Sequence, residues 1–109
     1  MKKFTLLLVL ISSSVFAGDP FKEFPGQYYF STDSDNGVSE MSFRIMGEAG
    51  KKMYEGIDQI PERDDCDVSN NLIKYLGNIQ CHYNPDDESH ICYFGININT
   101  GGFGSGISC

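Results

Sequence analysis

Two stretches of the chain combine strand-forming side chains with turn residues in the way that is typical of β-hairpins. The first runs from Gln27 to Thr32 and resumes from Val38 to Met46, and Asp33–Gly37 between them is dense in turn-forming residues. The pair Asn36-Gly37 suits the positive φ angles of a tight hairpin turn. The sequence therefore predicts a hairpin in the first half of the chain.

The second stretch consists of two strand-like runs, Leu72–Tyr83 and His90–Ile98, separated by the polar segment Asn84–Ser89. A turn centred on Asp86 and Asp87 gathers the apolar side chains on one face, as a half-buried antiparallel pair requires. Both hairpin cysteines then point into the core. This register predicts the cross-strand pairs Cys81 with Cys92, Ile79 with Phe94, Gly77 with Ile96, and Tyr75 with Ile98.

Between the hairpins the apolar period changes from two to about four, because Ala49, Met53, Ile57 and Ile60 follow at spacings of four, four and three. This pattern predicts an amphipathic helix over Gly47–Ile60 that stops before Pro61. The predicted fold is α+β: a four-stranded antiparallel sheet in hairpin-helix-hairpin order, with one helix packed on it and two disulfides. Its predicted core consists of Ala49, Met53, Ile57, Phe43, Ile45, Ile79, Phe94, Ile96 and Ile98.

The first 17 residues have the three parts of an export signal: a basic start at Lys2 and Lys3, an apolar run over Phe4–Ile11 and a small-residue exit ending at Ala17. The apolar run is far shorter than the roughly 20 residues of a membrane-spanning helix. We therefore expect residues 1–17 to be a cleaved signal peptide. Residues 18–109 then form a single small domain in the periplasm or the secreted fraction.

The charge of the chain limits the partners that it favours. The sequence has 8 Lys and Arg against 15 Asp and Glu, a formal charge of −7, and loss of the two leader lysines leaves six basic residues and a charge of −9. Nucleic acids and anionic membranes need a basic surface, so both are disfavoured. A cationic protein is favoured, although the same charge would also serve solubility alone. The sequence does not define an oligomeric state.

Four cysteines, Cys66, Cys81, Cys92 and Cys109, all follow the leader. An even number in a small exported chain indicates a disulfide framework, and the absence of a C-x-x-C pair argues against a zinc site. The opposed cysteines could pair directly as Cys81–Cys92, which leaves Cys66 for Cys109. The arrangement Cys66–Cys81 with Cys92–Cys109 keeps both loops short and is slightly preferred, since a bridge at Cys109 would also order the glycine-rich tail.

No motif of the chain predicts catalysis, a metal or a cofactor. Asp33, Asp35 and Glu40 could suggest a calcium loop, but Gly37 stands fifth from Asp33 rather than sixth, which favours a turn. The tail segment 102–106 lacks the spacing of phosphate-binding loops and nucleophile elbows, and a turn-rich coil is the better interpretation. The two histidines, His82 and His90, lie on opposite faces of the predicted hairpin, so they do not converge on one site.

Three groups of residues carry a resemblance: Gly47-x-Ala49-x-Lys51-x-x-Tyr54, Lys74-x-x-Gly77-Asn78-Ile79-x-Cys81, and Cys92-x-Phe94-Gly95-Ile96-Asn97-Ile98-x-x-Gly101 with Cys109. Through these residues the chain resembles small exported bacterial proteins, periplasmic and cysteine-paired, of unassigned function. The resemblance extends over about two thirds of the mature chain. It implies a bacterial periplasmic origin and no catalytic or binding residue. Periplasmic lysozyme inhibitors are similar in size, acidity and compartment only.

The acidic loops are the candidate binding residues. Acids on turns that project from a rigid sheet can dock into a cationic cleft and accelerate the encounter with it. We therefore expect a binding module, not an enzyme, that inhibits or neutralises a basic enzyme outside the cytoplasm. The alternatives are a small enzyme with an unrecognised site and a structural envelope protein. The candidate residues are Glu62, Asp64, Asp65, Asp67, Asp86, Asp87 and Glu88.

Overall fold

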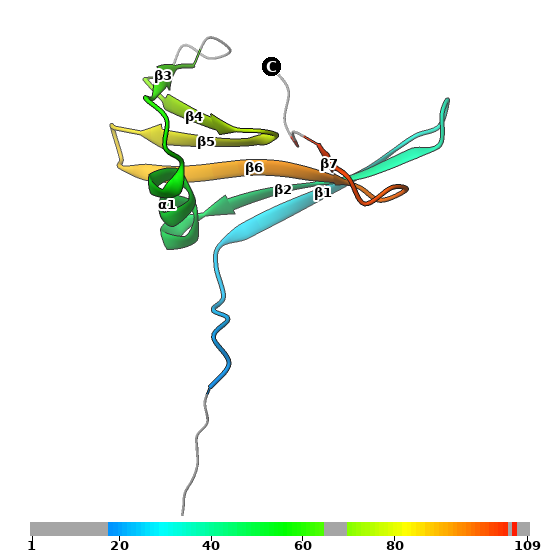
Figure 1. The fold of residues 1–109 in the computed structure, drawn as a ribbon, viewed down its shortest axis with the longest axis horizontal. Coiled ribbons are helices and arrows are strands. Elements are labelled where there is room, and N and C mark those ends of the chain that lie inside the picture. The colour runs from blue at the N-terminus through cyan, green and yellow to red at the C-terminus, as the bar shows by residue number, and fades with distance from the viewer. Residues whose placement is uncertain (1–17, 65–69, 105, 107–109) are drawn as a thin grey trace, which may run out of the picture.

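The computed structural model describes residues 18–64, 70–104 and 106. These residues form one antiparallel sheet and one helix (Figure 1). The strand order across the sheet is β1-β2-β6-β5-β4-β3, and β7 pairs with β6 beyond the point where β5 ends. The elements are β1 (Gly26–Asp33), β2 (Val38–Met46), α1 (Gly47–Gly56), β3 (Glu62–Arg63), β4 (Leu72–Leu76), β5 (Ile79–Asn84), β6 (Ser89–Asn97) and β7 (Phe103–Gly104).

The prediction of a four-stranded sheet with two disulfides is wrong. The described residues form seven strands in one antiparallel sheet, and they contain one disulfide, which joins Cys81 to Cys92. The preferred pairings Cys66–Cys81 and Cys92–Cys109 are therefore wrong as well. Direct pairing follows from the register, because Cys81 and Cys92 are directly opposite on β5 and β6 with Cα atoms 4.0 Å apart. Cys66 and Cys109 lie outside the described residues.

The structure has more strands than predicted partly because the segment Leu72–Tyr83 forms two strands instead of one. The chain reverses at Gly77-Asn78, so that Leu76 of β4 is opposite Ile79 of β5. Gly77 has a φ of 57°, which glycine adopts readily, and glycine is favoured at the first position of one type of two-residue hairpin turn. The predicted pair of Cys81 with Cys92 is confirmed. The pairing of β5 with β6 ends at Gln80, and the predicted partners for Gly77 and Tyr75 are wrong.

The glycine-rich tail also contributes a strand, where a turn-rich coil was predicted. The Asn97 side chain accepts hydrogen bonds from the amides of Asn99 and Thr100, and the Asn97 carbonyl accepts one from Gly101. This turn sends Phe103 and Gly104 back along β6 as β7. The short strand β3 likewise adds to the other edge of the sheet by pairing with β4.

The first hairpin is confirmed, with β1 and β2 paired from Gly26 opposite Ile45 to Asp33 opposite Val38. Its turn is closed by a backbone hydrogen bond of 2.7 Å from the Gly37 amide to the Asp33 carbonyl, and Gly37 has a φ of 71°. The Asp33 carboxylate accepts the Asp35 amide at 2.9 Å. These acids thus take part in building the turn, as their local hydrogen-bonding chemistry favours.

Helix α1 ends at Gly56, four residues before the predicted end. Glycine is a poor helix former, and Ile57 already has extended backbone. Ile57 is buried, whereas Ile60 is 84% exposed and takes no part in the apolar stripe. The helix has no basic residue in its last turn, but Lys74 of β4 donates a hydrogen bond of 3.0 Å to the Tyr54 carbonyl. A cation at this end stabilises the helix.

The core lies where α1 packs on β2, β5 and β6. Tyr54, Ile57, Cys81 and Cys92 form the buried cluster, and Met53, Ile79 and Tyr83 pack against it. The predicted packing of Met53 and Ile57 against the sheet is therefore confirmed. The predicted core residue Ile98 is 52% exposed, because β6 ends at Asn97. Tyr54 belongs to the core, although the apolar pattern did not include it.

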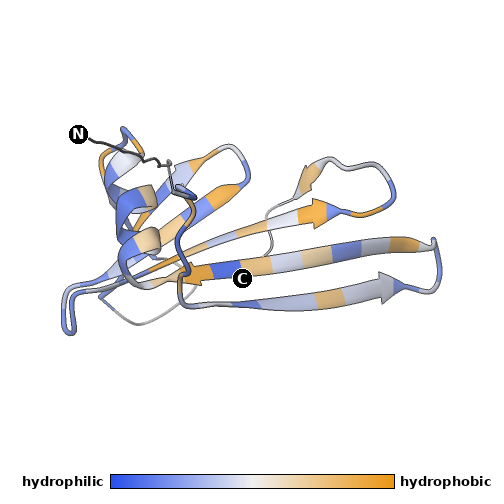
Figure 2. Cartoon of the chain, turned by 90° about the horizontal axis from the view of Figure 1, so that it is seen from below, coloured by the Kyte–Doolittle hydropathy of each residue, from blue (hydrophilic) through white to orange (hydrophobic). Residues whose placement is uncertain are grey.

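The helix covers only one end of the sheet, and the long strands run past it (Figure 2). We call the part beneath α1, with Cys81, His90 and Cys92, the covered end. The opposite end of the long strands, formed by most of β1, the first half of β2, the last half of β6 and β7, is the open end. No described element packs over the open end, and its exposed apolar side chains are Tyr28, Tyr29, Phe30, Val38, Ile98 and Phe103.

Candidate functional site

The turn between β5 and β6 carries three consecutive exposed acids, Asp86, Asp87 and Glu88. Two side chains fix its shape: Asn84 Oδ1 accepts the Asp86 amide at 2.9 Å, and Asp87 Oδ1 accepts the Ser89 amide at 3.0 Å. Glu88 has a φ of 60°, a left-handed conformation that few residues other than glycine adopt. The three acids therefore project from a turn with a defined backbone.

The strands beneath this turn are firmly held. The Cys81–Cys92 disulfide joins β5 to β6 a few residues below the acids. Nearer the turn, the His90 ring lies 4.8 Å from the Tyr83 ring and 5.3 Å from the Tyr54 ring of α1, measured between ring centroids. The cross-link and the packed rings restrain the base of the hairpin, so the turn projects from a firmly held part of the covered end.

Local hydrogen bonds favour the charged form of Asp87 in this turn. The side chain and the amide of Ser89 lower the pKa of the Asp87 carboxyl, since both stabilise the ionised form. Nearby, burial is the main cause that lowers the pKa of His90; on α1, Glu55 and Glu48 raise this pKa by less, and Lys51 lowers it further. His90 is therefore uncharged near neutral pH, and it adds no positive charge beneath the acids.

The other predicted acids are placed in different environments. Glu62 is exposed on β3, whereas Asp64 is only 6% exposed and is turned inward rather than toward a partner. Asp65 and Asp67 lie outside the described residues. Arg63 pairs with Leu72 and Leu72 with Tyr83, so the end of β3 and the β5–β6 turn lie at the same end of the sheet. The structure thus brings Glu62 and the acidic turn to one end, but it removes Asp64 from that surface.

Asp64 instead contacts His82, a pairing that the sequence did not indicate. Asp64 Oδ2 lies 3.6 Å from His82 Nδ1, and both side chains are largely buried. On the other side of the ring, His82 Nε2 lies 2.9 Å from Gln80 Nε2, and the Tyr93 ring meets the imidazole edge-on at 5.3 Å. A carboxylate at one ring nitrogen orients a histidine. The contact ties the segment after β3 to β5.

The prediction that the histidines do not converge is confirmed. His82 is opposite Ile91 and His90 is opposite Tyr83, so these adjacent pairs of the β5–β6 ladder direct the two rings to opposite faces of the sheet. His82 meets Tyr93 on the face away from the helix, and His90 meets Tyr54 of α1. Each histidine thus has its own aromatic neighbour.

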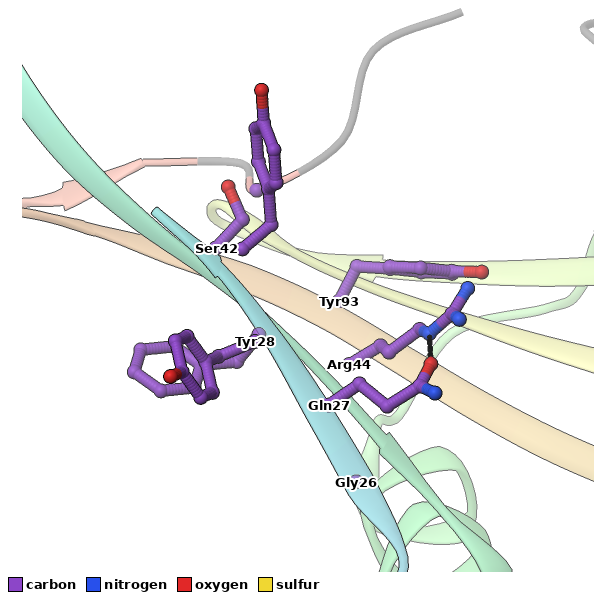
Figure 3. Close-up of a pocket in the computed structure, with 9 residues that line it drawn as sticks. Gly26, Gln27, Tyr28, Ser42, Arg44 and Tyr93 are labelled. Atoms are coloured by element: carbon purple, nitrogen blue, oxygen red, sulfur yellow. Dashed lines mark hydrogen bonds between the residues drawn. The ribbon is translucent and has the colours of Figure 1, made fainter. Parts of the chain in front are cut away.

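Two adjoining shallow hollows that sequence reasoning missed lie beside β1 and β2, and both include Gly26, Gln27, Tyr28, Phe43 and Arg44. The larger, of about 680 Å³, includes Gln27, Tyr29, Ser42, Arg44 and Tyr93 (Figure 3). Arg44 Nε donates a hydrogen bond to Gln27 Oε1 across the two strands. The smaller hollow, of about 360 Å³, is lined mainly by apolar side chains: Phe24, Tyr28, Phe43, Ile45 and Phe94. In the sequence, the aromatic run Tyr28–Phe30 was the feature that could have indicated these hollows.

Within the described ranges, no group of three or more His, Cys, Asp or Glu side chains is arranged to hold a metal ion. The same residues include no helix that is long and apolar enough to cross a membrane. No protein-family model matches the chain, and no curated protein or solved structure is significantly similar to it.

Proposed function

We propose that this chain is an exported binding module that neutralises a cationic protein in the periplasm or the secreted fraction. The turn Asp86–Glu88 is its principal contact. The observation that carries the proposal is the set of three consecutive exposed carboxylates on a turn whose backbone is fixed by Asn84 and Asp87. A contact surface that is already ordered loses little conformational entropy when it binds.

Charge supports the same conclusion. With its leader removed, the chain carries an expected formal charge of −9, so it attracts a basic protein over a distance of about 8 Å at physiological salt. The hairpin then presents its acids at the tip of a narrow projection, a shape that suits a cationic cleft. Attraction of this kind raises the association rate, and salt weakens it.

The experiment is affinity capture from envelope and secreted fractions with the mature protein as bait, at low and at high salt. A cationic protein that is retained at low salt and released at high salt supports the proposal. The captured protein is then assayed for its own activity with and without the bait. An absence of any salt-sensitive partner contradicts the proposal and favours a structural role in the envelope.

Matched variants locate the contact. Asp86→Asn with Asp87→Asn removes two charges from the proposed site while keeping the oxygen that accepts the Ser89 amide. Asp33→Asn with Asp35→Asn makes the same charge change in the β1–β2 turn, at the opposite end of the sheet, and keeps the oxygen that accepts the Asp35 amide. We expect the first pair to weaken binding about tenfold or more, and the second to change it far less. Equal losses would show that net charge acts without a defined site.

A further inference from the structure

Strand β1 forms one edge of the sheet, and its outer side has no described neighbour. The Met46 amide donates a hydrogen bond of 2.8 Å to the Pro25 carbonyl. Bonding alternates along an antiparallel pair, so Gln27, Tyr29 and Ser31 direct their backbone groups toward β2. The N–H and C=O groups of Tyr28 and Phe30 then point to the open edge, together with those of Gly26 and Thr32.

This edge lacks the features that protect most edge strands. Natural proteins block open edges with charged side chains, prolines, bulges or very short strands. β1 has eight residues, and neither a charged residue nor a proline occurs between Gly26 and Thr32. Its pairing with β2 is continuous, and Tyr28 and Tyr29 are 71% and 68% exposed on opposite faces. β1 is therefore ready to accept another strand.

The two hollows flank this same strand. Strand addition obtains affinity from main-chain hydrogen bonds and specificity from pockets that receive alternate side chains. The hollows beside β1 include Phe43 and Phe94 on one face of the sheet and Arg44 and Tyr93 on the other. An added strand with aromatic side chains on both of its faces would place rings beside both hollows.

We propose that the strand added at this edge is β1 of a second copy of the chain, antiparallel, with the two-fold axis at Tyr29. Only the outward-facing residues can bond across the edge, which limits the register to those that place Gly26, Tyr28, Phe30 and Thr32 opposite one another. Among these, the register centred on Tyr29 is the one that pairs all four residues. Tyr28 is then opposite Phe30 of the second copy, Gly26 is opposite Thr32, and Tyr29 is opposite its own counterpart. Aromatic side chains in directly opposed positions stabilise an antiparallel pair.

A second copy supplies an aromatic strand of the kind described above, and the uncharged stretch of β1 lets the two acidic chains approach. Two copies of an acidic chain repel each other, so they can meet only along a surface without charge, and β1 provides one from Gly26 to Thr32. In this register Asp33 is opposite Pro25 rather than another acid. The acidic turn between β5 and β6 is separated from β1 by β2 and β6, so it stays free for the cationic partner proposed above.

The test uses charge reversal at the two-fold axis, with sedimentation equilibrium of the mature protein as the measurement. The unaltered protein is expected to dimerise. Tyr29→Lys and Tyr29→Glu each oppose two like charges, so each alone is expected to weaken the dimer about 100-fold or more. An equimolar mixture of the two variants is expected to restore it, because opposite charges then meet. Ile60→Lys adds a charge at an exposed residue outside β1 and is expected to leave dimerisation unchanged.

Restored dimerisation in the mixture cannot result from misfolding of either variant, so it supports the proposal directly. Three results would overturn it: a monomeric unaltered protein, single variants that dimerise as well as the unaltered protein, or a mixture that stays monomeric. A monomer that instead binds an extended segment of another protein at β1 would also overturn it and would identify that segment as the occupant.

Discussion

The covered end and the open end of the sheet are built from similar strands but have different surfaces. At the covered end, α1 buries Tyr54 and Ile57 against the disulfide, and the adjoining turn presents acids to solvent. At the open end no described element covers the aromatic side chains, and Tyr28 and Tyr29 remain largely exposed. One helix of ten residues is thus too short to cover strands of eight and nine residues along their whole length.

This difference suggests that one end of the sheet contributes mainly to the stability of the fold and the other to association with a partner. Burial of apolar surface stabilises the fold, and here it is concentrated beneath α1. Exposed apolar surface contributes nothing until a partner covers it, and contiguous patches of this kind mark interaction sites. We infer that the covered end stabilises the fold and supports the acidic turn. The open end is the surface to which we propose that a second chain binds.

The largest expected effect on stability is the loss of the buried Tyr54, which we compare with the loss of the exposed Tyr29. Tyr54→Ala is expected to lower the free energy of unfolding by about 3–5 kcal/mol, as for other buried aromatic residues. Tyr29→Ala, at an exposed position, is expected to change it by about 0.5 kcal/mol or less. Urea denaturation at low protein concentration measures both values. Similar losses in the two variants would contradict the assignment of stability to the covered end.

Removal of the disulfide is the next largest change. Cys81→Ala with Cys92→Ala is expected to cost about 2–4 kcal/mol, since the bridge restricts the unfolded chain and lies at the centre of the core. The control is Thr32→Ala with Ser39→Ala, which removes a cross-strand hydrogen bond of 3.1 Å between exposed hydroxyls at the open end. A cost of about 1 kcal/mol or less is expected there, and thermal unfolding compares the two. A larger loss in the control than in the cysteine variant would reverse the comparison.

A smaller effect on stability is expected from substitution of Gly50, where α1 lies close to the backbone of the sheet. A Cβ atom on Gly50 would lie 2.7 Å from the Ile45 carbonyl oxygen and 3.1 Å from that of His90. Both neighbours are backbone, so Gly50→Ala is expected to cost about 1–3 kcal/mol. Gly56 is in the same helix and has no atom within 4 Å of that position, so Gly56→Ala is expected to stabilise by about 0.4–1 kcal/mol. Chemical denaturation that gives both variants the same sign would contradict this packing.

The smallest effect is the pH dependence from His90. Burial lowers its pKa below the usual 6.5, so below pH 6.5 the unfolded chain binds a proton more readily than the folded one. Stability is then full above pH 6.5 and falls as the pH decreases toward the folded pKa. The difference between the unaltered protein and His90→Gln, from urea denaturation across this range, isolates the residue. A difference that does not vary with pH would exclude it as a cause.

The sequence predicted those elements whose determinants are local. Asn36-Gly37 predicted the first hairpin, and the alternation around Asp86 predicted that Cys81 is opposite Cys92. The split at Gly77-Asn78 was overlooked because the apolar residues on either side read as one strand, although a glycine between two strand-like runs is a turn signal. Tyr54 was overlooked because the apolar positions of the helix were counted from Ala49. That count selects Met53 and passes over Tyr54, the next residue.

Other features depend on contacts that no local pattern records. Asp64, which follows β3, meets His82 of β5, although β4 lies between these two strands in the sheet. The choice among disulfide pairings also depends on which strands are neighbours. The exposure of the open end could not be predicted, because it follows from the absence of a covering element among the described residues. The run Tyr28–Phe30 is equally compatible with a buried strand and with an exposed edge. Of the candidate acids, the sequence correctly placed the Asp86–Glu88 turn at the surface, but it did not indicate that Asp64 is buried.

Amide hydrogen exchange along β1, followed by NMR at low and high protein concentration, tests the division between the two ends most directly. The account predicts that amides of α1, β5 and β6 at the covered end are protected at every concentration. The Tyr28 and Phe30 amides, which face the open edge, should exchange rapidly in dilute solution and become protected as the concentration rises, whereas the Tyr29 amide between them should be protected by β2 throughout. Rapid exchange of Tyr28 and Phe30 at all concentrations, or weaker protection at the covered end than in β1, would contradict the account.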